Sequence, residues 1–219
     1  MPIEVKICGL STPETVTAAV EAGAAMVGFV FYPKSPRAVS PLQAGRLARA
    51  VPGTVSTVGL FVDPDPAEVE AVLRVVPLDL LQLHGEESPD LVAGLRRRLG
   101  LPVMKAIRVG GPEDVARAER YADVADRLLF DARPVREGGL PGGNGHAFDW
   151  TLLAGRTWSL PWMLSGGLAA GTLTEAVRVT RAGALDVSSG VETSPGIKDP
   201  ALIRAFLKAA GTLGDPRET

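Results

Sequence analysis

Two side chains suited to proton transfer stand directly after apolar runs in distant parts of the sequence. Cys8 follows Lys6-Ile7, and Asp131 follows Leu-Leu-Phe. A thiolate can remove a proton from carbon, and a half-desolvated carboxylic acid can donate one near neutral pH, so the pair fits general acid–base chemistry. Each residue also has a plainer interpretation: Cys8 as a small buried hydrophobe and Asp131 as the cap of a turn. Where the folded chain places them decides between the two.

The surroundings of Cys8 control how readily it ionises. Alternation along a strand puts Lys6 and Cys8 on one face and Ile7 on the other. A free thiol has a pKa of about 8.5, and a nearby cation raises the share of thiolate. Lys6 is the candidate for that cation.

Two further segments carry groups that can bind or orient a substrate. The proline-rigidified turn over residues 31–37 displays the guanidinium of Arg37, whose planar fork matches a carboxylate; the alternative is an ordinary solvent-exposed arginine. Gln82 and His84 share one face of a strand-like run, where His84 either orders the site or packs structurally. His146 and His84 lack HxxE or CxxC spacing, so no metal site is expected.

Two glycine-bearing turns near the carboxyl terminus suit an anion. They are Leu-Ser-Gly-Gly-Leu at 164–168 and Asp-Val-Ser-Ser-Gly-Val at 186–191. Glycine lets backbone N–H groups approach a phosphate, and the loops after strands seven and eight of an α/β barrel are its recurrent phosphate site. Each turn alone is also explained as a tight connection. Together they favour phosphate binding by Ser165, Gly166, Gly167, Ser188, Ser189 and Gly190.

Eight repeated units, each a strand followed by a helix, are expected to position these groups. Strand runs that are apolar on both faces indicate a parallel sheet covered by helices. Six helix starts pair Thr, Ser, Asp or Gly with Pro, which is typical of an N-cap followed by Pro at the first helical position. The expected strands are 4–7, 26–31, 55–61, 78–83, 103–108, 127–131, 161–164 and 185–187, and the helices begin near Pro13, Pro41, Pro66, Pro89, Pro112, Phe148, Ala170 and Pro200.

Such a pattern permits a closed barrel or an open doubly wound sheet. The absence of GxGxxG and the polar residues after many different strands favour the barrel. We therefore predict a single-domain α/β fold, a (β/α)8 TIM barrel over residues 1–210. Residues 211–219 form a polar tail that we expect to be frayed. The glycine-rich segment 138–145 follows the strand of Asp131 and is either a surface loop or a lid over the site.

The composition excludes several classes of partner. The 219 residues have a formal net charge of -2, which offers no overall attraction to nucleic acid or to an anionic membrane. One cysteine permits no internal disulfide, and neither a signal peptide nor a membrane span is visible. We expect a cytoplasmic protein, a monomer or a homodimer, with a phosphorylated small-molecule substrate.

Seven motifs, in order along the chain, resemble the N-(5'-phosphoribosyl)anthranilate isomerase family of tryptophan biosynthesis. They are KICG, FYPKSPR, QLHG, LLFD, GGNG, SGGL and DVSSGVE. The resemblance implies a TIM barrel that needs no cofactor and no metal. It also implies an Amadori rearrangement of N-(5'-phosphoribosyl)anthranilate to 1-(2-carboxyphenylamino)-1-deoxyribulose 5-phosphate, the third step from chorismate to tryptophan.

The resemblance also implies roles for individual residues. Cys8 is the general base, Asp131 is the general acid, and Arg37 takes the anthranilate carboxylate, while the SGGL and DVSSG loops take the phosphate. The family pattern has Thr where this chain has Asn144; both can bond the backbone, so we expect altered lid behaviour rather than lost activity. Supporting positions near the substrate are Gln82, His84 and Asp186.

Two other functions stay open on the residues alone. One is a different phosphosugar barrel enzyme built around a lysine, for which Lys105 on the fifth strand is the candidate, although no glutamate partner is evident on a neighbouring strand end. The other is a non-catalytic sensor of a phosphorylated ligand, which leaves Cys8 and Asp131 without a purpose. Turnover of phosphoribosylanthranilate separates all three.

Overall fold

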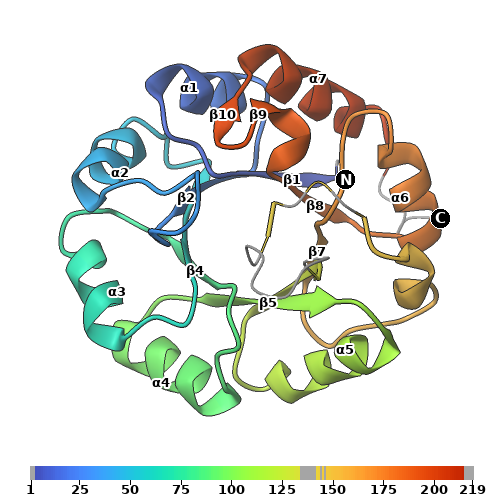
Figure 1. The fold of residues 1–219 in the computed structure, drawn as a ribbon, viewed down its shortest axis with the longest axis horizontal. Helices are drawn as coiled ribbons and strands as arrows, with labels where there is room; N and C mark the ends of the chain where they lie inside the picture. The colour runs from blue at the N-terminus through green and yellow to red at the C-terminus, as the bar shows by residue number, and fades with distance from the viewer. Residues whose placement is uncertain (1–2, 134–141, 144, 146, 215–219) are drawn as a thin grey trace.

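Eight parallel strands close into a barrel in the order β1 to β8. The computed structural model describes residues 3–133, 142–143, 145 and 147–214. The barrel closes where β1 pairs with β8, with Glu4 opposite Ala184 and Ile7 opposite Val187. Helices surround the strands as an outer ring (Figure 1). The predicted (β/α)8 architecture is confirmed, and the open sheet is excluded.

The strands lie where the apolar runs predicted them. Their bounds are β1 Glu4–Cys8, β2 Met26–Val30, β3 Ser56–Phe61, β4 Leu80–Leu83, β5 Val103–Val109, β6 Arg127–Ala132, β7 Trp162–Leu164 and β8 Ala184–Val187. The α-helices are α1 Pro13–Glu21, α2 Pro41–Ala48, α3 Pro66–Leu73, α4 Pro89–Leu99, α5 Pro112–Ala116, α6 Leu173–Thr180 and α7 Pro200–Gly211. The described residues also form three 3-10 helices: η1 Arg117–Tyr121, η2 Trp150–Leu153 and η3 Ser189–Val191.

Six helices begin at the predicted prolines because a preceding side chain or an extended residue caps each one. Ser40 Oγ accepts from the Gln43 N–H, and Ser88 Oγ accepts from the Leu91 N–H. Asp65 forms a capping box in which Glu68 bonds back to its N–H. Proline at the first helical position costs no hydrogen bond, because that N–H has no partner inside the helix.

The sixth unit departs from the prediction. The helix expected near Phe148 is the single 3-10 turn η2, which begins where Asp149 Oδ1 accepts from the Thr151 N–H and ends before Gly155, whose φ is +69°. Such short segments favour the tighter 3-10 turn over an α-helix. The seventh helix starts at Leu173 rather than at the predicted Ala170.

A short hairpin after β8 was not predicted. Its strands are β9 Glu192–Ser194 and β10 Ile197–Lys198, which pair antiparallel. Gly196 has a φ of +86°, as a turn residue after proline often requires. A Cβ at this position would overlap the carbonyl oxygen of Pro36, so the glycine lets the hairpin pack against the loop that carries Arg37.

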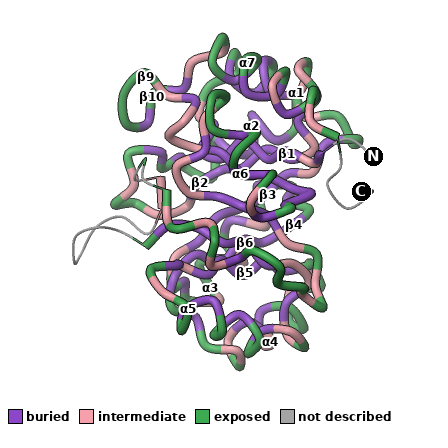
Figure 2. The backbone as a smooth tube through the Cα atoms, turned by 90° about the vertical axis from the view of Figure 1, so that its right-hand side faces the viewer, coloured by how far each residue is buried: buried purple, intermediate pink, exposed green. Residues whose placement is uncertain are grey.

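Alternate strand residues fill two separate cores. One lies between the strands and the helices and includes Ile7, Phe29, Phe130 and Phe206. The other lies inside the barrel and comprises Met26, Val58, Leu80, Met104, Ala106, Leu129, Met163 and Ala184. Burial along the strands is continuous (Figure 2). Because apolar side chains fill the inner levels, polar inward-facing residues occur at the carboxyl ends of the strands, where barrels build their sites.

The hairpin and the first described residues of the chain lie on opposite sides of the barrel (Figure 2). At the other end of the chain, α7 extends through Gly211, which is the first residue of the predicted tail, and residues 215–219 lie outside the described part of the structure. In the described part of the chain, every helix falls short of the length and apolarity of a membrane span.

Candidate active site

A cavity opens at the carboxyl ends of the strands. The predicted groups that line it come from units one, two, four, six, seven and eight of the barrel. They are Cys8, Arg37, His84, Asp131, Ser165, Asp186 and Ser188. Val30, Tyr32, Leu60 and Val62 supply an apolar wall. The fold therefore brings Cys8 and Asp131 to one cavity, although 123 positions separate them in the sequence.

Cys8 is buried beside an ion pair inside the barrel. Lys6 Nζ donates to Asp186 Oδ1 over 2.7 Å, and Ser165 Oγ donates to Asp186 Oδ2 over 3.0 Å. Burial lowers the pKa of Lys6, but Asp186 and Cys8 outweigh this effect, so the pKa is raised and the ammonium stays charged. Burial raises the pKa of Cys8, and the opposing pull of Lys6 is too weak to reverse it. Lys6 thus assists the thiolate less than its charge alone suggests, because Asp186 shares that charge.

Each carboxylate oxygen of Asp131 has one hydrogen-bond partner among the described residues, and the partner of Oδ2 is His84. Its Oδ1 accepts from the Ala132 N–H over 2.9 Å, and its Oδ2 lies 3.1 Å from His84 Nε2. Gln82 Nε2 lies 2.9 Å from His84 Nδ1 on the far side of the ring. With the Gln82 amide donating to Nδ1, the imidazole proton is on Nε2 and points to Asp131. Gln82 therefore lies behind His84 and orients it.

Glycines let the backbone approach both reactive side chains. A Cβ on Gly28 of β2 would lie 3.2 Å from the Cys8 sulfur, and a Cβ on Gly142 would lie 2.9 Å from Asp131 Oδ2. A Cβ at Gly142 would require a neighbouring atom to shift, and one at Gly28 would crowd the sulfur, so glycine suits both positions. The predicted lid lies largely outside the described residues, as do Asn144 and His146. Its role stays a prediction.

Arg37 is buried and already engaged on one edge. Its Nε and Nη2 donate to the two carboxylate oxygens of Glu192 over 2.7 and 2.8 Å, and Nη2 also donates to the Gly143 carbonyl over 3.1 Å. Lys198 Nζ donates to Glu192 Oε1 over 2.5 Å. Within the described residues Nη1 has no acceptor. The fork predicted for a substrate carboxylate is thus partly filled by Glu192, and the Nη1 edge is the one left for a ligand.

The two glycine-bearing turns line a second, adjoining cavity. Gly166 and Gly167 have φ values of +84° and +67°, a region that other residues rarely adopt. A Cβ on Gly190 would overlap the Leu168 carbonyl oxygen, so the two turns touch through glycine. Backbone N–H groups in glycine-rich turns of this kind can bind an anion. The lining includes Gly145, Ser165, Gly166, Gly167, Ser188 and Ser189.

Ser188 connects the two cavities and lines both of them. Its Oγ donates to the Cys8 carbonyl over 3.1 Å. Lys198 Nζ donates to both the carbonyl and the Oγ of Ser188, over 2.9 and 3.0 Å. The turn predicted to bind phosphate is therefore tied to the first strand and to the hairpin.

Sequence reasoning missed Glu192, Lys198 and the partner of Lys105. Glu192 and Lys198 lie on β9 and β10, and the quoted DVSSGVE motif was the available signal for Glu192. The statement that Lys105 lacks a glutamate was wrong: its Nζ donates to Glu87 Oε2 over 2.8 Å. Lys105 Nζ also donates to the carbonyls of Gly85 and Ala106, and Lys105 is not among the residues that line the cavity of Cys8 and Asp131.

The described part of the chain contains no cluster of metal-binding side chains. No group of three or more His, Cys, Asp or Glu side chains is close enough there to hold an ion.

The closed barrel and the cavity at its carboxyl face, which is lined by a guanidinium and proton-transfer side chains and adjoins two glycine turns, define a (β/α)8-barrel enzyme. The sequence profile of the family described as N-(5'phosphoribosyl)anthranilate (PRA) isomerase matches residues 5–209. The chain belongs to this family, and it is an isomerase of tryptophan biosynthesis.

Relatives and solved structures agree over nearly the whole chain. The N-(5'-phosphoribosyl)anthranilate isomerase of Rhodospirillum centenum is 60% identical over 97% of this chain and 100% of its own, and that of Paramagnetospirillum magneticum is 56% identical over 96% and 98%. The Thermotoga maritima crystal structure of this enzyme is 40% identical, covers 96% of this chain and 100% of its own, and has a TM-score of 0.85. A crystal structure of a phosphoribosyl anthranilate isomerase with reduced 1-(o-carboxyphenylamino)-1-deoxyribulose 5-phosphate is 38% identical over 96% of this chain and 100% of its own (TM-score 0.83).

Proposed function

We propose that this cavity carries out an Amadori rearrangement of N-(5'-phosphoribosyl)anthranilate by general acid–base catalysis, with Asp131 as the acid and Cys8 as the base. The observation that carries the proposal is that these two side chains line one cavity between an arginine and two glycine turns. The substrate has a carboxylate at one end and a phosphate at the other. The reacting carbons are then held between the two proton-transfer groups.

The first step opens the sugar ring. A proton passes from Asp131 to the ring oxygen, the bond between that oxygen and the anomeric carbon breaks, and the nitrogen lone pair forms an iminium ion. Oδ1 of Asp131 accepts from a backbone N–H and Oδ2 from the His84 side chain, and we assign the transferred proton to Oδ2, the oxygen that faces side chains of the cavity. His84 and Gly142 flank Oδ2 and fix its direction.

The second step removes a proton from carbon. The iminium ion acidifies the neighbouring C–H of the sugar, so the thiolate of Cys8 can take that proton, and the electron pair moves to give a neutral enolamine. The enolamine then tautomerises to the ketone. Burial raises the pKa of Cys8, which makes its thiolate scarcer but more basic.

Two anion-binding ends orient the substrate. The Nη1 edge of Arg37, which has no acceptor in the described part of the chain, suits the anthranilate carboxylate, and the apolar wall with Tyr32 and Val62 suits its ring. Backbone N–H groups of the turns at Gly166, Gly167 and Ser189 suit the phosphate. Lys6, Asp186 and Ser165 support the floor of the site and hold a matched buried charge there.

Turnover of freshly prepared phosphoribosylanthranilate by the purified chain tests the proposal. We expect conversion to the carboxyphenylamino deoxyribulose phosphate without added metal or cofactor. Conversion of a related phosphosugar with none of phosphoribosylanthranilate would favour the lysine-based alternative. Calorimetric binding with no product over hours would favour the sensor.

The location and the assembly belong to the same proposal. We propose that the chain acts in the cytoplasm, as a monomer or a homodimer. A solved relative is described as monomers generated from a dimeric Thermotoga maritima enzyme, so both states occur in the family's solved structures. Sedimentation at assay concentration measures which state this chain adopts.

A further inference from the structure

Glu192 touches neither of the two proposed proton-transfer groups, yet it binds the arginine at the edge of their cavity. It lies at the start of β9, and its carboxylate is buried between two cations, Arg37 and Lys198. Burying a charge is costly unless it is paired and hydrogen-bonded, so the three groups form one electrostatic unit. With two cations and one carboxylate, the unit keeps a net charge of +1 next to the cavity.

The bonds around Glu192 define which part of Arg37 is available. Oε1 accepts from Arg37 Nε and from Lys198 Nζ, while Oε2 accepts from Arg37 Nη2. The aliphatic stem packs closely on Gly9, where an added Cβ would lie 2.9 Å from Arg37 Cδ. The guanidinium therefore has one orientation, with its Nη1 donors unused among the described residues.

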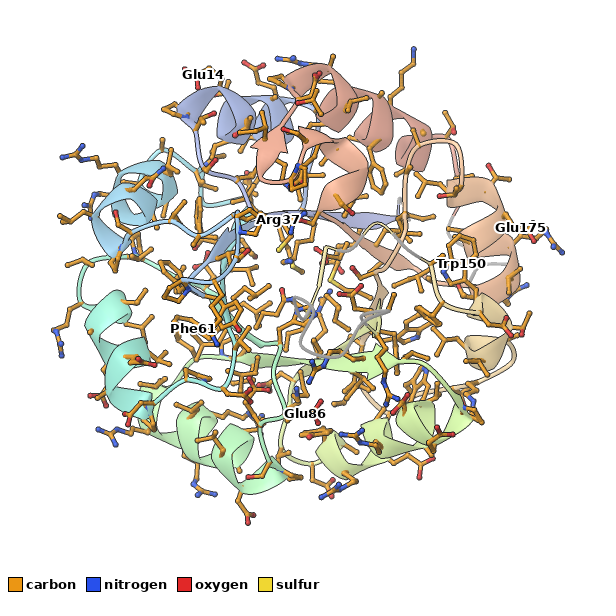
Figure 3. The ribbon with its side chains drawn as sticks, in the orientation of Figure 1. Glu14, Arg37, Phe61, Glu86, Trp150 and Glu175 are labelled. Atoms are coloured by element: carbon orange, nitrogen blue, oxygen red, sulfur yellow. The ribbon has the colours of Figure 1, made fainter. Side chains whose placement is uncertain are left out.

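Lys198 holds the carboxylate in place from the other side. All three of its N–H donors are engaged, by Glu192 and by two oxygens of Ser188. Arg37 lies toward the middle of the ring of strands, whereas Glu175, which pairs with Arg178 on α6, lies at the outer rim (Figure 3). Glu175 thus provides a matched ion pair remote from the cavity.

We infer that Glu192 is a positioning residue that presents Arg37 to the substrate carboxylate, and that it thereby sets selectivity for a carboxylate-bearing aromatic amine. This inference rests on the proposed contact between Arg37 and that carboxylate. A guanidinium pinned on two of its donors loses less conformational entropy when it binds an anion through the remaining ones. The hairpin β9–β10 acts as the support for this residue.

The test compares two substrates in Glu192→Gln. In the variant, the amide oxygen can still accept from Lys198, but the amide NH2 faces the Nη2 donor of Arg37 and no longer holds it. We expect kcat/KM for phosphoribosylanthranilate to fall about tenfold to a hundredfold, the scale of one charge-assisted hydrogen bond, mainly through KM. For N-(5'-phosphoribosyl)aniline, which lacks the carboxylate, we expect a change below about threefold.

Control variants separate the possible failures. Glu175→Gln should leave both substrates unaffected, and Arg37→Ala combined with Glu192→Gln should be no worse than Arg37→Ala alone, because both changes remove one interaction. Equal losses on the two substrates in Glu192→Gln would overturn the inference. If Arg37→Ala also fails to discriminate between them, the proposed carboxylate contact itself is wrong. Should Glu192→Gln fail to fold, Glu192→Asp, which keeps the charge but not the reach, must show the same selective loss.

Discussion

Replacing Lys6 by methionine should destabilise the fold strongly, because it strands a buried carboxylate. Lys6 is fully buried, and Asp186, which is 3% exposed, keeps the hydroxyl of Ser165 as its one hydrogen-bond partner among the described residues once the ammonium is gone. Removing one partner of such a pair costs about 3–5 kcal/mol. For a chain of this size, about 2–4 °C of melting temperature corresponds to 1 kcal/mol, so the variant should melt about 6–20 °C lower.

A second substitution tests whether the stranded Asp186 carboxylate causes the loss of folding stability in Lys6→Met. Asp186→Asn in the Lys6→Met background removes the stranded charge while it keeps an acceptor for Ser165, so the double variant should recover part of the lost stability. Guanidinium unfolding followed by circular dichroism gives the free energies of unfolding. A single variant within about 1 kcal/mol of wild type, or a double variant that is no more stable than the single one, would refute the reasoning.

Three other outcomes follow from the same geometry. The rate of Cys8 alkylation by iodoacetamide, plotted against pH, should have its inflection above the ordinary thiol pKa of about 8.5, because burial raises the pKa of Cys8. An inflection at or below that value contradicts this account. Burial alone raises the pKa of Glu192, but Arg37 and Lys198 lower it overall, so its ion pairs stabilise the fold at neutral pH and lose that contribution as the pH falls through the lowered pKa. The melting difference between wild type and Glu192→Gln should therefore shrink as the pH falls from 7 to about 3, and a constant difference would speak against it. Gly190→Ala should weaken competitive inhibition by inorganic phosphate at least about tenfold, since the new Cβ overlaps a backbone oxygen, whereas Gly171→Ala, with open space around it, should not.

Local patterns were enough to predict the elements and the side of the barrel on which the site lies. Two-residue alternation places Lys6 and Cys8 on one face of β1, and the structure has both directed into the barrel interior. Proline after a capping residue fixed most of the helix starts. The prediction for the sixth unit failed because the segment between Asp149 and Gly155 forms one 3-10 turn. Residue types alone do not distinguish such a turn from a short α-helix.

Contacts between distant segments could not be predicted in the same way. Glu192 meets Arg37 across 155 positions, and the pairing depends on a hairpin of five strand residues that carries little periodicity. The pKa of Cys8 likewise depends on Asp186, which shares the charge of Lys6 from the opposite end of the chain. Such pairings are set by barrel closure, and the local sequence does not encode them.

The most direct measurement of the central claim compares wild type, Cys8→Ala and Asp131→Asn in the conversion of phosphoribosylanthranilate, with folding checked by circular dichroism. A base and an acid that act on one bound sugar predict that kcat falls at least about a hundredfold in each variant, while binding of a reduced product analogue stays within about threefold of wild type. Rates near wild type in both variants would contradict the assignment of Cys8 and Asp131.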